Sequence, residues 1–96
     1  MTHYVAIVED AGPERAVGIW FPDLPGCFSA GDTMDDALVN APEAIMLYVE
    51  ALERAGRGPP RARTLSQLKD DARFVEEARD NLIAIVHLPA AAAAAE

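Results

Sequence analysis

Carboxylates gather at one point of the chain, where Asp32, Asp35 and Asp36 follow one another closely and Asp23 precedes them. Carboxylate oxygens are the ligands that Mg²⁺ prefers, and two ions held in this way hydrolyse phosphodiester bonds. One interpretation is therefore a metal-dependent nuclease that uses Asp23, Asp32 and Asp36. We favour a structural role, in which these acids begin a helix, because Asp35 and Asp36 would point about 100° apart on that helix.

The other reactive side chains are isolated in the sequence. His3 and His87 each fall at the end of an expected strand and have no second ligand at metal-binding spacing. Cys27 is the single cysteine, so it forms no intrachain disulfide, and no base lies close to it in the sequence. We therefore expect no catalytic residue, no metal and no cofactor, and a protein that is not an enzyme.

The balance of charge also limits the function. The chain has 96 residues, 16 acids against 8 bases, and a net charge of −8, which suits one acidic domain. Such a surface repels phosphate, so we expect no autonomous binding of nucleic acid and instead a basic protein partner. The N-terminus lacks the features of a signal peptide and no apolar run reaches the roughly 20 residues of a membrane span, which predicts a cytoplasmic protein.

The pattern of apolar and turn residues predicts a mixed α+β chain. A long helix begins at Asp32 or Thr33 and ends before Gly56, and Pro42 either kinks it or marks a fresh start capped by Asn40. A second, more polar helix covers 66–79. The expected strands cover residues 3–9, 16–21, 27–30 and 82–88.

Both faces of the expected sheet are apolar. On the first strand, one alternating row of apolar residues begins at Tyr4 and the row on the other face begins at Val5; on the second strand, Trp20 lies on the face opposite to that strand's own apolar row. The long helix covers one face only. The second helix, a second copy of the chain or another partner covers the other. The last strand is apolar throughout, which predicts burial on both faces or cover by a partner. We place it at the sheet edge beside the first strand and expect a homodimer or higher homo-oligomer.

Residues 20–37, WFPDLPGCFSAGDTMDDA, combine a rigid Pro/Gly turn, a short strand and a Gly-Asp-Thr helix start. This order resembles the core signature of HicB-type antitoxins, and the resemblance extends over residues 3–88. It implies a two-layer α+β domain similar to a truncated ribonuclease H fold. In that domain a three-stranded antiparallel meander is followed by a crossover helix and a fourth strand parallel to the first.

The resemblance also implies a function. HicB-type antitoxins bind and occlude small basic ribonuclease toxins of the HicA type, and we expect the same here, without chemistry by this chain. Residues 1–89 would form the antitoxin domain and 90–96 a low-complexity alanine tail. The family's C-terminal DNA-binding module is not expected, so neither is DNA binding by this chain alone. The alternative is an orphan homo-oligomeric scaffold without a toxin.

We predict that the toxin contacts one end of the sheet, formed by the loop Asp23–Cys27 and the helix start Gly31–Asp35. Their carboxylates would imitate RNA, and substitution of Asp23 and Asp32 by lysine would leave the fold intact. Gly26 would adopt a positive φ. A second candidate surface is the open sheet face that would carry Tyr4 and Trp20. The predicted contact residues are Asp23, Leu24, Pro25, Gly26, Asp32, Asp35, Tyr4 and Trp20.

Overall fold

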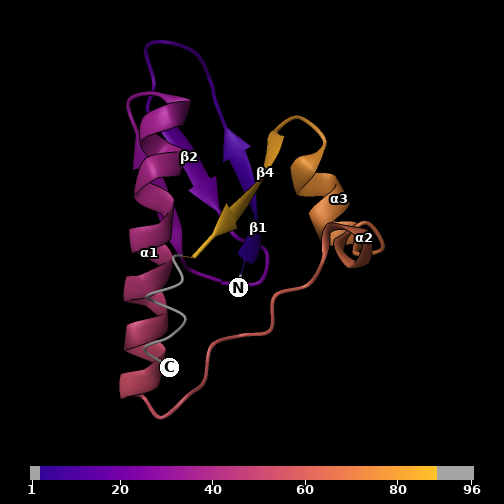
Figure 1. Ribbon diagram of the computed structural model, residues 1–96. Helices are drawn as coiled ribbons and strands as arrows, with labels where there is room; N and C mark the ends of the chain where they lie inside the picture. The colour runs from indigo at the N-terminus through magenta and orange to yellow at the C-terminus, as the bar shows by residue number, and fades with distance from the viewer. Residues whose placement is uncertain (1–2, 89–96) are drawn as a thin grey trace.

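The computed structural model describes residues 3–88, which form a four-stranded sheet with helices on both faces (Figure 1). The predicted tail 90–96 lies outside the described residues. No helix among the described residues is long and apolar enough to cross a membrane. The elements follow the order β1 (His3–Glu9), β2 (Val17–Trp20), β3 (Phe28–Gly31), α1 (Met34–Arg54), α2 (Leu65–Leu68), α3 (Ala72–Ala78) and β4 (Leu82–His87).

The strands are ordered β3-β2-β1-β4, and each neighbouring pair is antiparallel. This confirms the three-stranded meander and the place of β4 at the edge beside β1. The predicted parallel direction of β4 is wrong, because His87 pairs with His3. The chain leaves α1 at one end of the sheet and residues 55–81 carry it back to the other, so β4 enters from that end (Figure 1). The implied kinship with ribonuclease H stays a prediction.

Helices cover both sheet faces, so the structure has three layers where the sequence predicted two. On the α1 face, the helix packs against a core that includes Tyr4 and Ile19. On the α2–α3 face, Leu68 and Phe74 pack against Val5 and the neighbouring Ile7. Of the alternatives for the second face, cover by a helix of the same chain is therefore confirmed for the centre of the sheet.

Local signals at both ends explain the length of α1. Thr33 is the N-cap, and its hydroxyl accepts a hydrogen bond from the Asp36 backbone N–H at 3.1 Å. Gly56 ends the helix with φ +77°, where the Arg57 N–H donates to the Leu52 carbonyl oxygen. Pro42 lies inside one continuous helix, so the alternative of a fresh start at residue 40 is wrong.

The predicted helix over 66–79 is two short helices. The Asp71 carboxylate accepts hydrogen bonds from the backbone N–H groups of Arg73 and Phe74, which makes it the N-cap of α3. Because an N-cap residue has non-helical backbone angles, Asp71 interrupts the helix that begins at Leu65. The interruption lets both Leu68 and Phe74 reach the sheet.

Candidate functional site

The turn between β2 and β3 is held rigidly. Leu24 and Cys27 donate backbone hydrogen bonds to Phe21 and Leu24 respectively, both at 3.0 Å, and the Leu24 side chain is buried. The Tyr48 hydroxyl donates to the Pro25 carbonyl oxygen at 2.7 Å. Gly26 has φ +86°, which confirms the predicted positive φ. The backbone of the turn is therefore held in one conformation and is tied to α1 through Tyr48.

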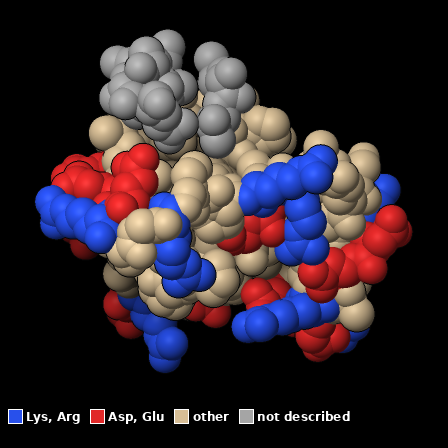
Figure 2. All heavy atoms as spheres, turned by 90° about the horizontal axis from the view of Figure 1, so that it is seen from below, with Lys and Arg blue, Asp and Glu red and all other residues tan. Residues whose placement is uncertain are grey.

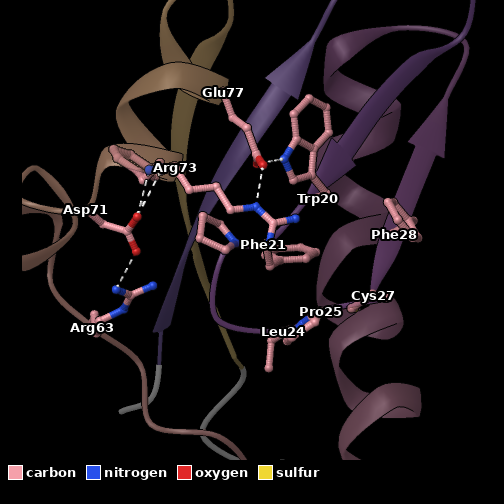
Figure 3. Close-up of a pocket in the computed structure, with 13 residues that line it drawn as sticks. Trp20, Phe21, Leu24, Pro25, Cys27, Phe28, Arg63, Asp71, Arg73 and Glu77 are labelled. Carbon is pink, nitrogen blue, oxygen red and sulfur yellow. Dashed lines mark hydrogen bonds and ion pairs between the residues drawn. The ribbon is translucent and has the colours of Figure 1, made fainter.

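Asp23 in this turn points inward, not toward a partner. Its two carboxylate oxygens accept hydrogen bonds from the backbone N–H and the Nε of Arg63, both at 2.7 Å. Its side chain is only 9% exposed. Arg63 also donates to Asp71 at 2.9 Å (Figure 3). Because the same side chain binds Asp23, one guanidinium joins the turn to the start of α3. Substitution of Asp23 by lysine would break this link, which disagrees with the expectation of an intact fold.

A groove of about 580 Å³ lies between the turn and α3, lined by aromatic and charged side chains (Figure 3). Within it, Trp20 Nε1 donates a hydrogen bond to Glu77 Oε1 at 2.8 Å, and Arg73 Nε donates to Glu77 Oε2 at 3.0 Å. The Trp20 hydrogen bond and then that of Arg73 lower the pKa of Glu77. Phe28 projects at the rim and is 69% exposed. The charged groups of the groove thus already bind one another.

The outward side of α1 carries a different surface. Val39 is 77% exposed and Leu47 60%, although both lie in the middle of a long helix. Residues three and four apart share one side of a helix, so acids fall between these apolar residues. Glu50 is paired with Arg54, whereas no ion pair involves Asp36 or Glu43 in the described part of the chain. We call this surface the α1 outer face; its exposed residues are Asp36, Val39, Glu43, Met46, Leu47 and Glu50.

Comparison with known proteins gives a family for this arrangement. The family model described as "HicB_like antitoxin of bacterial toxin-antitoxin system" matches residues 4–94. This chain belongs to the HicB-like antitoxin family. Its sequence is also 44% identical over 46 residues to an uncharacterized 14.9 kDa protein of Haemophilus phage HP1. That match spans 48% of this chain and 35% of the length of the phage protein.

Solved structures agree with the family. The Burkholderia pseudomallei antitoxin HicB superposes with a TM-score of 0.75 at 27% identity, covering 96% of this chain and 67% of that one. A chain from the HicA3 and HicB3 toxin-antitoxin complex gives a TM-score of 0.71 at 29% identity, covering 92% of this chain and 99% of that one. The resemblance inferred from the turn and helix start is confirmed, and the family is consistent with a non-enzymatic protein.

The structure of this member of the HicB-like antitoxin family separates the two parts of the predicted toxin contact. The loop Asp23–Cys27 precedes β3, and the helix start Gly31–Asp35 follows it, so they lie at opposite ends of that strand. The predicted common end is therefore wrong. Figure 2 views the molecule from below, the end toward which β2 runs in Figure 1, and shows acidic and basic side chains side by side on it. That end does not present a continuous acidic surface.

The second predicted contact surface is also divided. Tyr4 is buried on the α1 face, where its hydroxyl donates to the Pro60 carbonyl oxygen at 2.6 Å. Trp20 pairs with Ile7 and lies on the α2–α3 face. One open face carrying both aromatic residues is therefore wrong. Alternation along each strand predicts which residues share a side, but the pairing of β1 with β2 decides which rows meet.

Of the residues that suggested chemistry, the carboxylates remain apart and Cys27 is buried. His3 and His87 do come together, because they pair across β1 and β4 with ring centroids 5.6 Å apart. Asp23 and Asp36 lie on opposite sides of β3, and within residues 3–88 no three His, Cys, Asp or Glu side chains gather to hold a metal ion. Burial raises the pKa of the Cys27 thiol to about 11, and its Sγ lies 3.6 Å from the Ala44 carbonyl oxygen. Such a thiol stays protonated near neutral pH and is a poor nucleophile.

Sequence reasoning missed the groove and the α1 outer face. The groove depends on the contact of Trp20 with Glu77, 57 residues later, which no local pattern reveals. The α1 outer face did leave a signal, because Val39 and Leu47 fall outside the inward apolar stripe of the helix. Counting apolar residues on the polar side of the helix would have found it.

Proposed function

We propose that this HicB-like antitoxin binds and occludes a basic ribonuclease toxin of the HicA type, in the cytoplasm where such a toxin meets RNA. The α1 outer face carries this proposal, because it combines exposed apolar side chains with the acids Asp36 and Glu43. Apolar contacts supply affinity at an interface, and complementary charge supplies rapid encounter. The similarity to a chain of the HicA3 and HicB3 complex supports the same partner class.

Occlusion needs no catalytic group on this chain. A helix side with acids flanking apolar residues can cover a basic surface that grips RNA, and the toxin is then blocked sterically. Asp32 and Asp35, near the N-terminal end of α1, would extend the negative field toward that partner. The residues of the turn from Asp23 to Gly26 would act indirectly, by fixing the sheet against which α1 packs.

The test is co-expression with the HicA-type protein encoded next to this gene, read out as cell growth, together with purified association rates at two salt concentrations. Glu43→Lys should slow association several-fold, more at low salt, because steering charges act on the association rate. Asp70→Lys is the matched control, since Asp70 is exposed, lies outside α1 and undergoes the same charge change.

Val39→Ala with Leu47→Ala should weaken neutralisation while leaving stability nearly unchanged, because both side chains already face water. Failure of the wild-type chain to rescue growth would overturn the antitoxin proposal and favour the orphan scaffold. Full rescue by these variants, with rates equal to those of Asp70→Lys, would instead remove the α1 outer face as the contact.

A further inference from the structure

The register between β1 and β4 brings together the two histidines, which are far apart in the sequence. His3 at the start of β1 pairs with His87 at the end of β4, so both lie at the same end of the sheet (Figure 1). Their ring centroids are 5.6 Å apart, and the ring planes are inclined by 48°. The rest of β4 is apolar and leaves Ile83 and Ile85 exposed, so its predicted burial on both faces is wrong for this chain alone.

Both imidazoles lie on the α2–α3 face of the sheet. Side chains alternate along a strand, which places His3 on the same face as Val5, and residues that pair across antiparallel strands share a face. The next pair of residues, Tyr4 with Val86, is buried, so packing fixes the backbone beside the histidines. A ligand that binds between the two rings would therefore have to order only two side chains, which lowers the entropic cost of binding.

The distance between the rings suits a shared metal ion. An imidazole nitrogen lies about 2.0–2.1 Å from bound Zn²⁺, so two rings on one tetrahedral ion have centroids roughly 5 Å apart. The observed separation of 5.6 Å is close to this value, and the tilt of the planes excludes flat stacking. Within residues 3–88, no ion pair involves either imidazole, so no carboxylate there competes for the ring nitrogens.

We propose that His3 and His87 bind one divalent transition-metal ion of the class that prefers imidazole, represented here by Zn²⁺. Histidine is the commonest protein ligand for such ions, whereas Mg²⁺ prefers oxygen. No third histidine, cysteine or acidic side chain in the described part of the chain joins the pair, so water would fill the remaining positions. The net charge of −8 attracts cations toward the chain and favours their binding.

The ion would link the first and last strands of the described chain. β4 is an edge strand that pairs only with β1, and a metal shared between the two strands would add a second connection at one end of that pairing. Because an ion that binds only the folded pairing stabilises it by mass action, the stability of this edge would follow the concentration of free ion. The pair does not lie on α1, so the inference does not depend on toxin binding.

Isothermal titration of the untagged, metal-free full chain with ZnCl₂ at neutral pH tests the proposal. We expect one ion per chain, and an affinity that falls at least about tenfold in His3→Gln and in His87→Gln, because each variant removes one of two protein ligands. MgCl₂ should give no comparable binding. An excess of Zn²⁺ should also raise the melting temperature of the wild type and leave that of His87→Gln unchanged.

A relocated histidine gives a matched control. His87→Gln combined with Leu82→His keeps two histidines in the chain and changes an exposed position of the same strand, but Leu82 pairs with Val8 at the far end of β4 from His3. This double variant should bind Zn²⁺ no better than His87→Gln alone.

Three results would overturn the proposal. The first is a wild type that does not bind Zn²⁺, or that binds it no more tightly than either single variant. The second is recovery of the wild-type affinity by the relocated histidine, which would show that proximity to His3 is not needed. The third is one ion for every two chains, with a sedimenting mass that doubles on addition of Zn²⁺, because the ion would then lie between two copies and not within one.

Discussion

Strands β3 and β4 form the two edges of the sheet, and the described chain treats them differently. At β3, the Ser29 hydroxyl donates to the Ala37 carbonyl oxygen at 3.1 Å, and Asn40 Nδ2 donates to the Ala30 carbonyl oxygen at 3.0 Å. Gly31 lets α1 approach the strand closely. At β4, no side chain in the described part of the chain does the same work, and the isoleucines stay exposed.

The contrast shows that one small domain can hold the two edges of a single sheet in different ways. At β3, the hydrogen bonds of Ser29 and Ala30 with α1 tie the edge strand to the helix, although Phe28 on the same strand stays exposed. At β4, the described chain pairs only one side of the strand and leaves its isoleucines exposed. The α1 outer face belongs to the same helix that is bonded to β3, so the proposed toxin contact lies on the side of the molecule that the β3 edge helps to hold in place.

The largest effect is expected from opening the β3 edge. A Cβ on Gly31 would lie 2.5 Å from the Ala37 backbone nitrogen and 2.7 Å from Asp36 Cβ, so Gly31→Ala must push the strand away from α1. We expect a loss of about 2–3 kcal/mol in the free energy of unfolding. Gly18→Ala on β2 is the control, because no atom lies within 4 Å of a Cβ placed there. Equal urea midpoints for the two variants would mean that α1 does not hold β3 tightly.

A second prediction concerns the turn that leads into β3. Gly26→Val forces a β-branched residue to φ +86° and should cost about 1–3 kcal/mol through backbone strain. Gly58→Val is the matched control, since Gly58 lies in a loop without a positive φ or a close neighbour. Thermal melts of both variants give the comparison. A melting temperature for Gly26→Val equal to that of Gly58→Val would exclude strain in the turn.

A smaller loss is expected at the buried hydroxyl that links β3 to α1. Ser29→Ala removes a hydrogen bond to the Ala37 carbonyl oxygen and should cost about 1 kcal/mol. Thr33→Ser is a useful control, because it keeps the N-cap hydroxyl of the same helix. Urea denaturation measures both. A Ser29→Ala variant as stable as Thr33→Ser would show that the hydroxyl does not help to close this edge.

Local sequence patterns were enough to predict several elements of the sheet and of the helix beside it. Alternating Val and Ile residues predicted the first strand, Thr33 predicted the helix start, and Pro and Gly predicted the turn with its positive φ at Gly26. The edge position of the last strand was also correct. The strand, the helix start and the turn depend on neighbours only a few residues apart, whereas the edge position followed from the order of the elements along the chain.

The features that failed depend on distant residues. The direction of β4 depends on the path of 55–81, in which Asp71 splits the expected helix. The inward orientation of Asp23 depends on Arg63, 40 residues later. The division of Tyr4 from Trp20 depends on the register between two strands. Local periodicity contains none of this information, so the candidate site was predicted less well than the strands.

The smallest effect is expected in the α2–α3 unit, which packs over β1 but does not cover β4. Arg63 pairs with Asp71 at the start of α3, and this hydrogen bond is the main cause that lowers the pKa of Asp71. A carboxyl group whose folded pKa is depressed stabilises the fold above its unfolded pKa of about 4, and this contribution disappears as the pH falls through the folded value. Asp71→Asn keeps a good N-cap residue, with one oxygen for the backbone N–H groups of Arg73 and Phe74, and removes the charge and the second oxygen that accepts from Arg63.

We therefore expect Asp71→Asn to melt slightly below the wild type at pH 7, with the gap closing as the pH is lowered toward 2. Asp70→Asn, an exposed neighbour of the same type, should show no such gap. If the α2–α3 unit is held over β1 partly by this pair, amide exchange in α3 should also accelerate in Asp71→Asn at neutral pH, whereas exchange in β3 should not change. A gap that is independent of pH would mean that the Arg63–Asp71 pair does not anchor the unit, and that Leu68 and Phe74 hold it on the sheet by packing alone.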